Sequence, residues 1–390
     1  MKTPENISPL ALAGTFDRSM LEMALSTPIM RESFDIGKPF VEDPYLNAMF
    51  RESAERCLKL PARQLDSDTV KGILGHVING SMVLLKNSKR LLPFTSQLLR
   101  SLAVIGPMAD GVVAEGMKNA APHHIQLAFA KGCPSDDTFS DELLAGALST
   151  AVKADAVILC LGTPDCGCPQ LPAPQLALLE ALNMLGKPMA AVVFGARPHI
   201  LEIVDKKADA VLLAWQLTAY HGLALGHTLF GQVNPSGRLP VTMPRPEDEQ
   251  DYEAENSSYL YMRQEPLYPF GYGLSYTRFV YSDLRLSKAS AGQTVTAECA
   301  VENSGTLAGH EVVQLYMRQE SRETRGFPRW SLCGTERIFL QPNETRAVEF
   351  KLPPLAGPAR YVVYVGGHQP DARSVWLSET PVLSAFVETE

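Results

Sequence analysis

The chain has 390 residues, of which 45% are hydrophobic, an ordinary size and composition for a globular protein of two or three domains. Its 35 Lys and Arg residues against 43 Asp and Glu give a formal net charge of -8, which argues against a nucleic-acid or anionic-membrane surface. No stretch reaches the roughly 18 to 20 apolar residues of a membrane span. We therefore expect neither nucleic acid nor membrane among its partners.

Residues 1–64 are predicted to form no independent domain. Residues 19–34 show helical spacing of apolar side chains that Pro28 interrupts, and two prolines in residues 37–45 break helical structure again. A clearer helix is predicted at residues 66–85. Asp66 or Ser67 can cap its start, and its apolar residues recur at spacings of three and four.

Short continuous apolar runs predict buried strands, and the segments between them predict helices. The strands are expected at residues 102–106, 156–162, 189–195 and 210–215. The helices are expected at residues 141–152, 174–185 and 221–230, with Gly231 ending the last. Buried strands that alternate with amphipathic helices predict a mostly parallel sheet covered on both faces, so residues 65–245 should form a three-layer α/β sandwich.

Residues 246–277 are predicted to be a connector. The sequence up to Tyr268 is charged, then rich in tyrosine, and it lacks apolar periodicity. We interpret it as a surface connector in preference to a binding loop.

From residue 279 the hydrophobic pattern changes to a period of two, which is typical of strands with one buried face. Residues 295–301 and 348–352 alternate apolar and polar side chains, and residues 303–305 and 342–344 supply turns at the spacing of a β-sandwich. Residues 278–390 are therefore expected to form a fibronectin type III-like β-sandwich. The predicted fold class is α/β plus all-β.

The cysteines predict neither a disulfide framework nor a metal site. The chain has seven, an odd number spread over its length, so reduced thiols are expected. Cys166 and Cys168, with Cys160 nearby, have no second pair and no histidine at ligand spacing. We expect no bound metal.

The isolated histidines and one glycine motif are predicted to be structural. His123, His124 and His221 are assigned to surface or packing roles in preference to catalysis. Residues 271–273 read Gly-Tyr-Gly, but no helix follows them, so they suit a turn that joins domains and not a phosphate loop. No cofactor is expected.

Two long motifs carry a family resemblance. Residues 229–240 read LFGQVNPSGRLP, and residues 269–276 read PFGYGLSY. In this order and spacing they resemble the signature of the second and third domains of glycoside hydrolase family 3, the β-glucosidase and β-xylosidase type. Residues 81–87, SMVLLKN, resemble the family's entry into its second domain. The resemblance implies that residues 1–64 are the end of the family's N-terminal (β/α)8 barrel and the linker that leaves it.

The resemblance implies a retaining glycosidase, which needs two carboxyl groups about 5 to 5.5 Å apart. The family's nucleophile is an Asp on a barrel strand, and no residue of this sequence matches that position. Its acid/base is a Glu on the loop that corresponds to residues 163–170, which read TPDCGCPQ. Asp165 is the only carboxylate in that loop, so it is the candidate proton donor, weighed against a role as a turn-capping Asp.

Other loops that face the sugar in this family also depart from its pattern. Residues 216–222 read QLTAYHG where the family has PG-EGG, and the loop expected between residues 107 and 131 is cut down. Arg197 matches the family's NGRP motif only in part, and we interpret it as structural. This combination of altered loops and retained packing segments is expected if the chain still folds but does not hydrolyse glycosides by itself.

The resemblance thus implies action on β-linked glucosides or xylosides together with a separately encoded barrel subunit that supplies the nucleophile. The alternatives are a non-catalytic module that binds a β-glycoside, an oligosaccharide or another partner, and an inactive truncated product. Residues 1–6 lack the apolar core of a signal peptide, so a cytoplasmic location is expected for the sequence as written. A periplasmic or secreted location is expected if the true N-terminus is missing.

Overall fold

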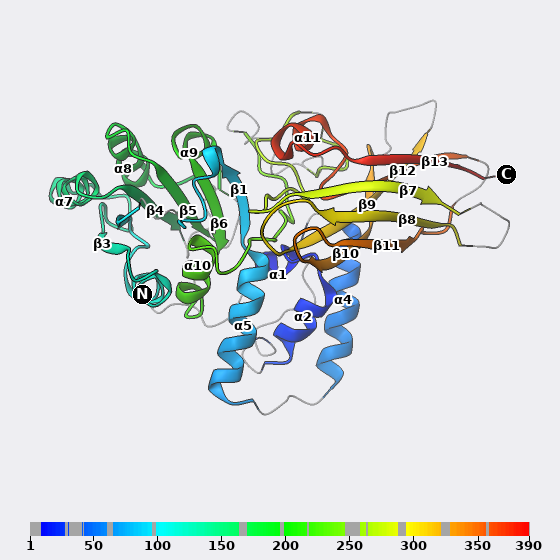
Figure 1. Ribbon diagram of the computed structural model, residues 1–390, viewed down its shortest axis with the longest axis horizontal. Helices are drawn as coiled ribbons and strands as arrows, with labels where there is room; N and C mark the ends of the chain where they lie inside the picture. The colour runs from blue at the N-terminus through cyan, green and yellow to red at the C-terminus, as the bar shows by residue number, and fades with distance from the viewer. Residues whose placement is uncertain are drawn as a thin grey trace.

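The computed structural model describes residues 9–27, 30, 41, 43–60, 65–95, 99–163, 170–195, 199–216, 218–245, 258–262, 264–287, 294–320, 328–355 and 359–389. Figure 1 shows a helical part below the junction of an α/β part and an all-β part. The helical part consists of α1 (Pro9–Ala13), α2 (Arg18–Leu25), α4 (Pro44–Lys59) and α5 (Ser67–Ser81). Across these described ranges, no helix combines the length and apolar character needed to cross a membrane.

A six-stranded sheet with the order β1-β6-β5-β4-β2-β3 forms the centre of the α/β part. Its strands are β1 (Val83–Asn87), β2 (Ser101–Ile105), β3 (Gln126–Ala130), β4 (Ala156–Thr163), β5 (Met189–Gly195) and β6 (Ala210–Trp215). Neighbouring strands are parallel, except that β1 runs antiparallel to β6.

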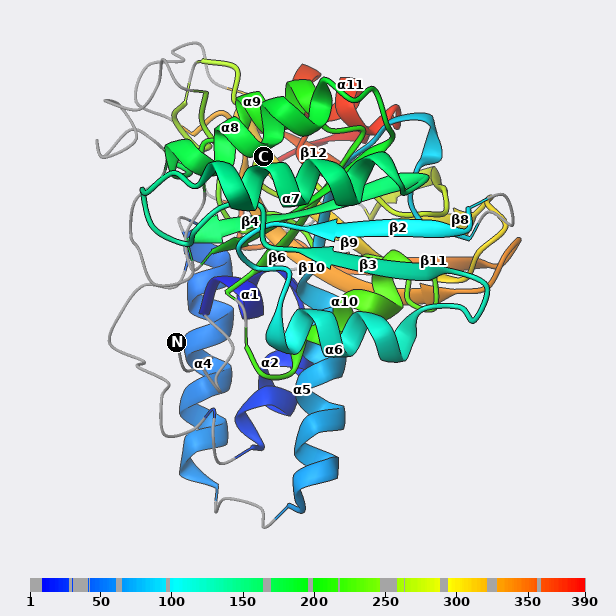
Figure 2. The same cartoon turned by 90° about the vertical axis from the view of Figure 1, so that its left-hand side faces the viewer.

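Helices cover both faces of this sheet. Figure 2 shows α7, α8 and α9 on one face and α6 and α10 on the other. The helices are α6 (Gly111–Ala120), α7 (Asp141–Val152), α8 (Ala173–Asn183), α9 (Glu202–Lys207) and α10 (His221–Leu229). The predicted three-layer α/β sandwich with a mostly parallel sheet is confirmed.

The helix predicted over residues 66–85 is wrong at its C-terminal end. α5 begins after Asp66, whose side chain accepts hydrogen bonds from the backbone of residues 68 and 69, and it ends at Ser81. Val83 and Leu84 belong to β1 and pair with Leu213 and Leu212 of β6. Both are fully buried, and a run buried on every side fits a covered strand better than one face of a helix.

Two segments contain elements that the sequence analysis missed. Residues 107–131, where the sequence analysis noted only a shortened family loop, contain α6 and the edge strand β3, whose partly exposed side chains weaken its apolar pattern. Residues 37–45, predicted to break helical structure, end in the start of α4. Pro44 occupies its first turn and Asp43 caps it, and proline is favoured at that position because it needs no hydrogen bond there.

The all-β part is a sandwich of two antiparallel sheets, with orders β10-β9-β12-β13 and β11-β8-β7. Its strands are β7 (Phe279–Leu286), β8 (Thr296–Asn303), β9 (Gly309–Glu320), β10 (Ser331–Leu340), β11 (Thr345–Lys351), β12 (Arg360–Gly366) and β13 (Leu383–Glu388), and the short helix α11 (Ala372–Ser378) precedes β13. Inward-facing residues of both sheets form a separate hydrophobic core. The predicted fibronectin type III-like sandwich is confirmed.

Three tyrosines of the predicted surface connector are buried, so that interpretation is wrong at these positions, while Tyr261 is 42% exposed. Tyr259, Tyr268 and Tyr272 are each at most 3% exposed. Tyr259 stacks on Phe270 with ring centroids 4.3 Å apart, and Tyr272 donates a hydrogen bond to the Leu85 carbonyl in β1. Aromatic rings supply the apolar contact here, while their hydroxyls reach backbone and side-chain acceptors.

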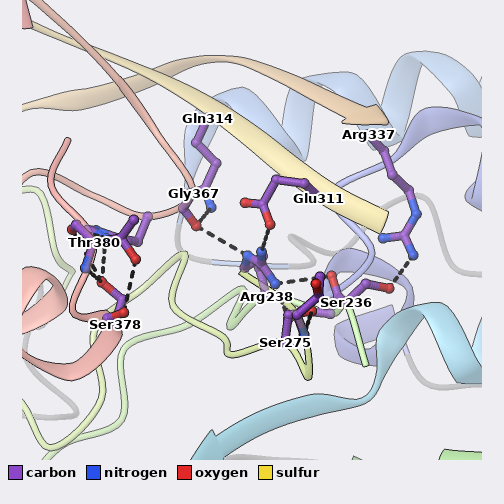
Figure 3. A network of polar contacts seen from close by, with 12 residues as sticks. Ser236, Arg238, Ser275, Glu311, Gln314, Arg337, Gly367, Ser378 and Thr380 are labelled. Carbon is purple, nitrogen blue, oxygen red and sulfur yellow. Dashed lines mark hydrogen bonds and ion pairs between the residues drawn. The ribbon is translucent and has the colours of Figure 1, made fainter. Parts of the chain in front are cut away.

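A buried ion pair joins the α/β part to the β-sandwich. Arg238, in the motif that follows α10, donates from Nη2 to Glu311 Oε2 of β9 at 2.8 Å, and both side chains are under 5% exposed. The same guanidinium donates to the carbonyls of Gly367, Ser236 and Gly237 (Figure 3). Tyr281 donates to the other oxygen of Glu311. Each charge is therefore paired and hydrogen-bonded, as a buried charge requires.

A second buried polar contact joins α4, the connector and the β-sandwich. Asp43 accepts hydrogen bonds from Leu46 N and from the Tyr259 hydroxyl, both at 2.7 Å, and Leu332 N in β10 donates to the same hydroxyl. Burial raises the pKa of the Asp43 carboxyl from 3.8 to about 6, against the lowering effect of its hydrogen bonds.

Replacing Arg238 by methionine should lower the free energy of unfolding by about 3 to 5 kcal/mol, because Glu311 would be left buried without its partner. The matched control is Arg18→Met, which breaks an exposed pair with Glu52 and should cost about 1 kcal/mol or less. Urea unfolding of the variants measures both. Equal losses in the two variants would contradict the assignment of Arg238 as the junction residue.

Asp43 should make the folded chain less stable as pH rises from about 4 to about 7. Its folded pKa of about 6 lies above its ordinary value of 3.8, so the folded state binds more protons in that window, and up to about 3 kcal/mol of stability is lost on ionisation. Asp43→Asn keeps the helix cap and removes the titration. Urea unfolding across this pH range should show the wild type falling relative to the variant, and parallel profiles would refute the assignment.

Candidate functional site

The carboxyl ends of the parallel strands form the candidate site. The chain passes from β2 to β3 on one side of β2 and then to β4 on the other, so its direction through the sheet reverses between β2 and β4. In open α/β sheets, ligands bind outside the carboxyl ends of strands at such a reversal.

Two glycines let the strand ends at this edge pack backbone against backbone. Gly106 follows β2 with φ 131°, and a Cβ there would lie 2.0 Å from the Cys160 carbonyl oxygen. Gly162 has φ 141°, and its Cβ would lie 1.9 Å from the Phe194 carbonyl oxygen. No other residue fits either position, so the two glycines fix how closely β2, β4 and β5 approach at their ends.

Gln175 of α8 holds the end of β4. Its Oε1 accepts from Gly162 N at 2.8 Å, and its Nε2 donates to the Gly162 carbonyl at 2.9 Å. The side chain is fully buried, so both of its polar atoms are satisfied by the strand. It fixes the backbone of Gly162 next to the last residue of β4.

Thr163 and His199 lie together at the edge. The Thr163 hydroxyl is 3.4 Å from His199 Nε2, which also lies 3.3 Å from the Phe194 carbonyl oxygen. Both residues are less than 10% exposed. They connect the ends of β4 and β5 at this edge.

His221 has the packing role that the sequence predicted. Its Nδ1 accepts a hydrogen bond from Thr218 N at 2.9 Å, and its Nε2 donates one to the Ala214 carbonyl oxygen at 2.9 Å. Burial lowers its pKa to about 4, so it stays neutral and ties the end of β6 to the start of α10. His123 and His124 are exposed before β3, as expected for surface residues.

Several predicted residues lie outside the described part of the chain, namely Asp165, Cys166, Cys168 and Arg197. The proton-donor role of Asp165 therefore stays a prediction. Among the residues that the structure does describe, no group of three or more His, Cys, Asp or Glu could hold a metal ion. Cys160 is buried in β4, and burial raises its thiol pKa to about 12, so it is an unreactive core residue.

The sequence analysis missed the roles of Gln175 and Glu311, which hold the edge and the junction. Each is a polar residue among apolar neighbours in a buried stretch of helix or strand. That mismatch is a usable signal, since a buried polar side chain needs a defined partner. The signal does not identify the partner, because Gly162 lies 13 residues from Gln175 in the sequence and Arg238 lies 73 residues from Glu311.

Comparison with protein families gives two matches. The model described as "Glycosyl hydrolase family 3 C-terminal domain" matches residues 82–276, which include the whole candidate edge. The model described as "Fibronectin type III-like domain" matches residues 311–357.

Two curated relatives are similar over most of the chain. A beta-xylosidase of Formosa agariphila is 33% identical over 313 residues, 70% of this chain and 43% of that protein. A periplasmic beta-glucosidase of Salmonella typhimurium is 30% identical over 339 residues, 71% of this chain and 44% of that protein. The chain thus spans less than half the length of these relatives.

Solved structures show the same architecture. A β-glucosidase from Erythrobacter marinus matches with a TM-score of 0.69 at 27% identity, over 88% of this chain and 55% of that one. A GH3 beta-glucosidase from Bifidobacterium adolescentis matches with a TM-score of 0.72 at 24% identity, over 88% of this chain and 58% of that one. The second likeness supports the fold alone.

Replacing Gly162 by alanine should lower the free energy of unfolding by more than about 3 kcal/mol, because the new Cβ would clash with Phe194 and the φ angle is strained for any side chain. The control is Gly146→Ala in α7, where a Cβ meets nothing within 4 Å. Because alanine is the better helix former, this change should raise the free energy of unfolding by at most about 1 kcal/mol. Chemical unfolding measures both. A Gly162 variant as stable as wild type would show that the strand ends are not packed in this way.

Proposed function

We propose a function from one premise: the chain belongs to glycosyl hydrolase family 3, whose C-terminal domain matches residues 82–276. The chain contributes the α/β and β-sandwich parts of a β-glycosidase that acts on β-linked glucosides or xylosides. The nucleophile comes from a (β/α)8 barrel supplied by a separate subunit. The names of the relatives support the substrate class, since those proteins are called beta-xylosidase and beta-glucosidase.

The observation that carries this proposal is the construction of the strand-end edge. Gly106, Gly162 and Gln175 fix the strand ends on either side of the reversal, including the end of β4. Such rigid support is what a catalytic loop needs, because groups misplaced by about 1 Å lose much of their effect. The edge thus supports a loop that works against a partner surface.

Asp165 is the proposed proton donor, on the sequence alone. It is the only carboxylate between Thr163 and Gln170, and a retaining glycosidase needs one carboxyl group as acid and a second as nucleophile. Asp110 is a described carboxylate at the same edge, exposed at the N-cap position of α6. It therefore serves as a control for a general effect of negative charge at the edge.

One observation favours the alternative of a non-catalytic binding module. The loop that should carry the acid has no Glu, and the side chain of Asp165 is one methylene shorter. A module of this kind would keep the rigid edge and bind a β-glycoside or oligosaccharide without cleaving it.

The test is hydrolysis of aryl β-glucosides and aryl β-xylosides by the chain alone and with a candidate barrel protein. We expect activity only in the mixture, and Asp165→Asn should lower kcat by about 10² to 10⁴, the usual contribution of a general acid. Asp110→Asn should leave kcat within about threefold of wild type.

Three results would count against parts of this proposal. Activity of the chain alone would contradict the need for a barrel subunit. Full activity of the Asp165 variant in the mixture would remove that residue as the acid. No hydrolysis by the mixture, together with binding of a sugar by the chain, would favour the binding module.

A further inference from the structure

A pocket of about 480 Å³ lies between α5 on one side and α6 and α10 on the other. This volume falls within the usual range of small-molecule sites, about 300 to 1,000 Å³. Its lining residues come from α5, from α6 and α10, and from the two residues before α10. Figure 2 shows α6 and α10 on one face of the sheet and α5 in the helical part.

The α6 and α10 wall of the pocket is rigid because the two helices touch through glycines. A Cβ at Gly116 would lie 1.9 Å from the Gly222 carbonyl carbon, and one at Gly226 would lie 2.5 Å from the Ala120 Cβ. Helices that approach this closely leave no room for rearrangement. The shape of this wall is therefore fixed before any ligand arrives.

The α5 wall carries glycines that packing does not require. Gly72 and Gly75 line the pocket, and a Cβ at either position would meet nothing within 4 Å. Each glycine costs a helix interior roughly 0.5 to 1 kcal/mol relative to alanine. Their effect is to keep this wall flat and the pocket open.

The pocket is rich in hydrogen-bonding groups and carries no net charge. Among the described residues that line it, Lys71 and Glu115 supply one charge of each sign. Burial lowers the pKa of His76 and of His227, so both imidazoles are neutral near pH 7. The ring of Tyr220 and the apolar Leu223 lie among these groups.

Two amides add donors and acceptors to the same lining, Asn79 from α5 and Asn119 from α6. Asn79 Oδ1 is buried and accepts no hydrogen bond within the described part of the chain. Buried polar atoms are normally satisfied, so an unsatisfied one at the wall of an open pocket indicates a group that a bound molecule can engage after a small side-chain rotation.

We propose that this pocket binds a neutral saccharide of mono- or disaccharide size. Saccharide hydroxyls both donate and accept hydrogen bonds, which suits a lining of amides, neutral imidazoles, a carboxylate and a phenol. The apolar faces of a sugar ring suit the ring of Tyr220 and the side chain of Leu223. The residues that line the pocket are the argument for a saccharide ligand. The choice of glucose- and xylose-based probes rests on the proposed function.

The test is binding of glucose, xylose, cellobiose and xylobiose to the 390-residue chain, measured by NMR titration of the histidine ring signals. At least one sugar should bind and shift the signals of His76 and His227. Gly75→Leu should weaken that binding by about tenfold or more, because the side chain enters the pocket. It should not lower stability, because glycine is the poorer helix former.

Gly146→Leu is the matched control, since a Cβ on α7 also meets nothing within 4 Å but lies outside the pocket lining. It should bind the sugar as wild type does. No binding of any probe by wild type would overturn the proposal, as would equal binding by the folded Gly75 variant. Neither result depends on hydrolysis, and the Asp165 variant should bind normally here, so a failure of this proposal is distinguishable from a failure of the proposed function.

Discussion

The buried pair of Arg238 and Glu311 is the contact on which the arrangement of the two folded parts depends. Neither charge could stay in the interior alone, so the α/β part and the β-sandwich must form their junction for either residue to be tolerated. This gives a physical reason for the motif after α10. Ser236 and Gly237 turn the chain and offer carbonyls to the guanidinium, and Arg238 itself reaches into the next domain.

The sequence predicted the architecture well where one periodicity dominates. Continuous runs of four or more apolar residues predicted each central strand, and α7 has the predicted bounds of Asp141–Val152. Prediction failed where two signals overlap. The run from Met82 to Leu85 satisfies both a helix face and a buried strand, and only its pairing with β6 decides between them. Pro44 was interpreted as a breaker, although at a first helical turn it favours the helix.

The candidate site was predictable only in part, for a related reason. A parallel sheet places its functional loops at the strand ends, so the sequence predicts a site after β4, but Asp165 lies outside the described residues and its role stays a prediction. The groups that hold those ends could not be predicted, because Gln175 and the two glycines act through contacts between separate strands and helices. Membership of glycosyl hydrolase family 3 accounts for the retained frame.

The connector's tyrosines give the molecule one more property. The hydroxyls of four of them, Tyr259, Tyr268, Tyr272 and Tyr276, donate to acceptors in the helical and α/β parts, which are Asp43, Asp205, Leu85 and Thr228. The ring of Tyr259 also packs edge-on against Tyr316 of β9. Movement of the connector away from the helical and α/β parts would break all of these bonds. Because β7 begins directly after this anchored segment, the position at which the chain enters the β-sandwich is fixed relative to the α/β part.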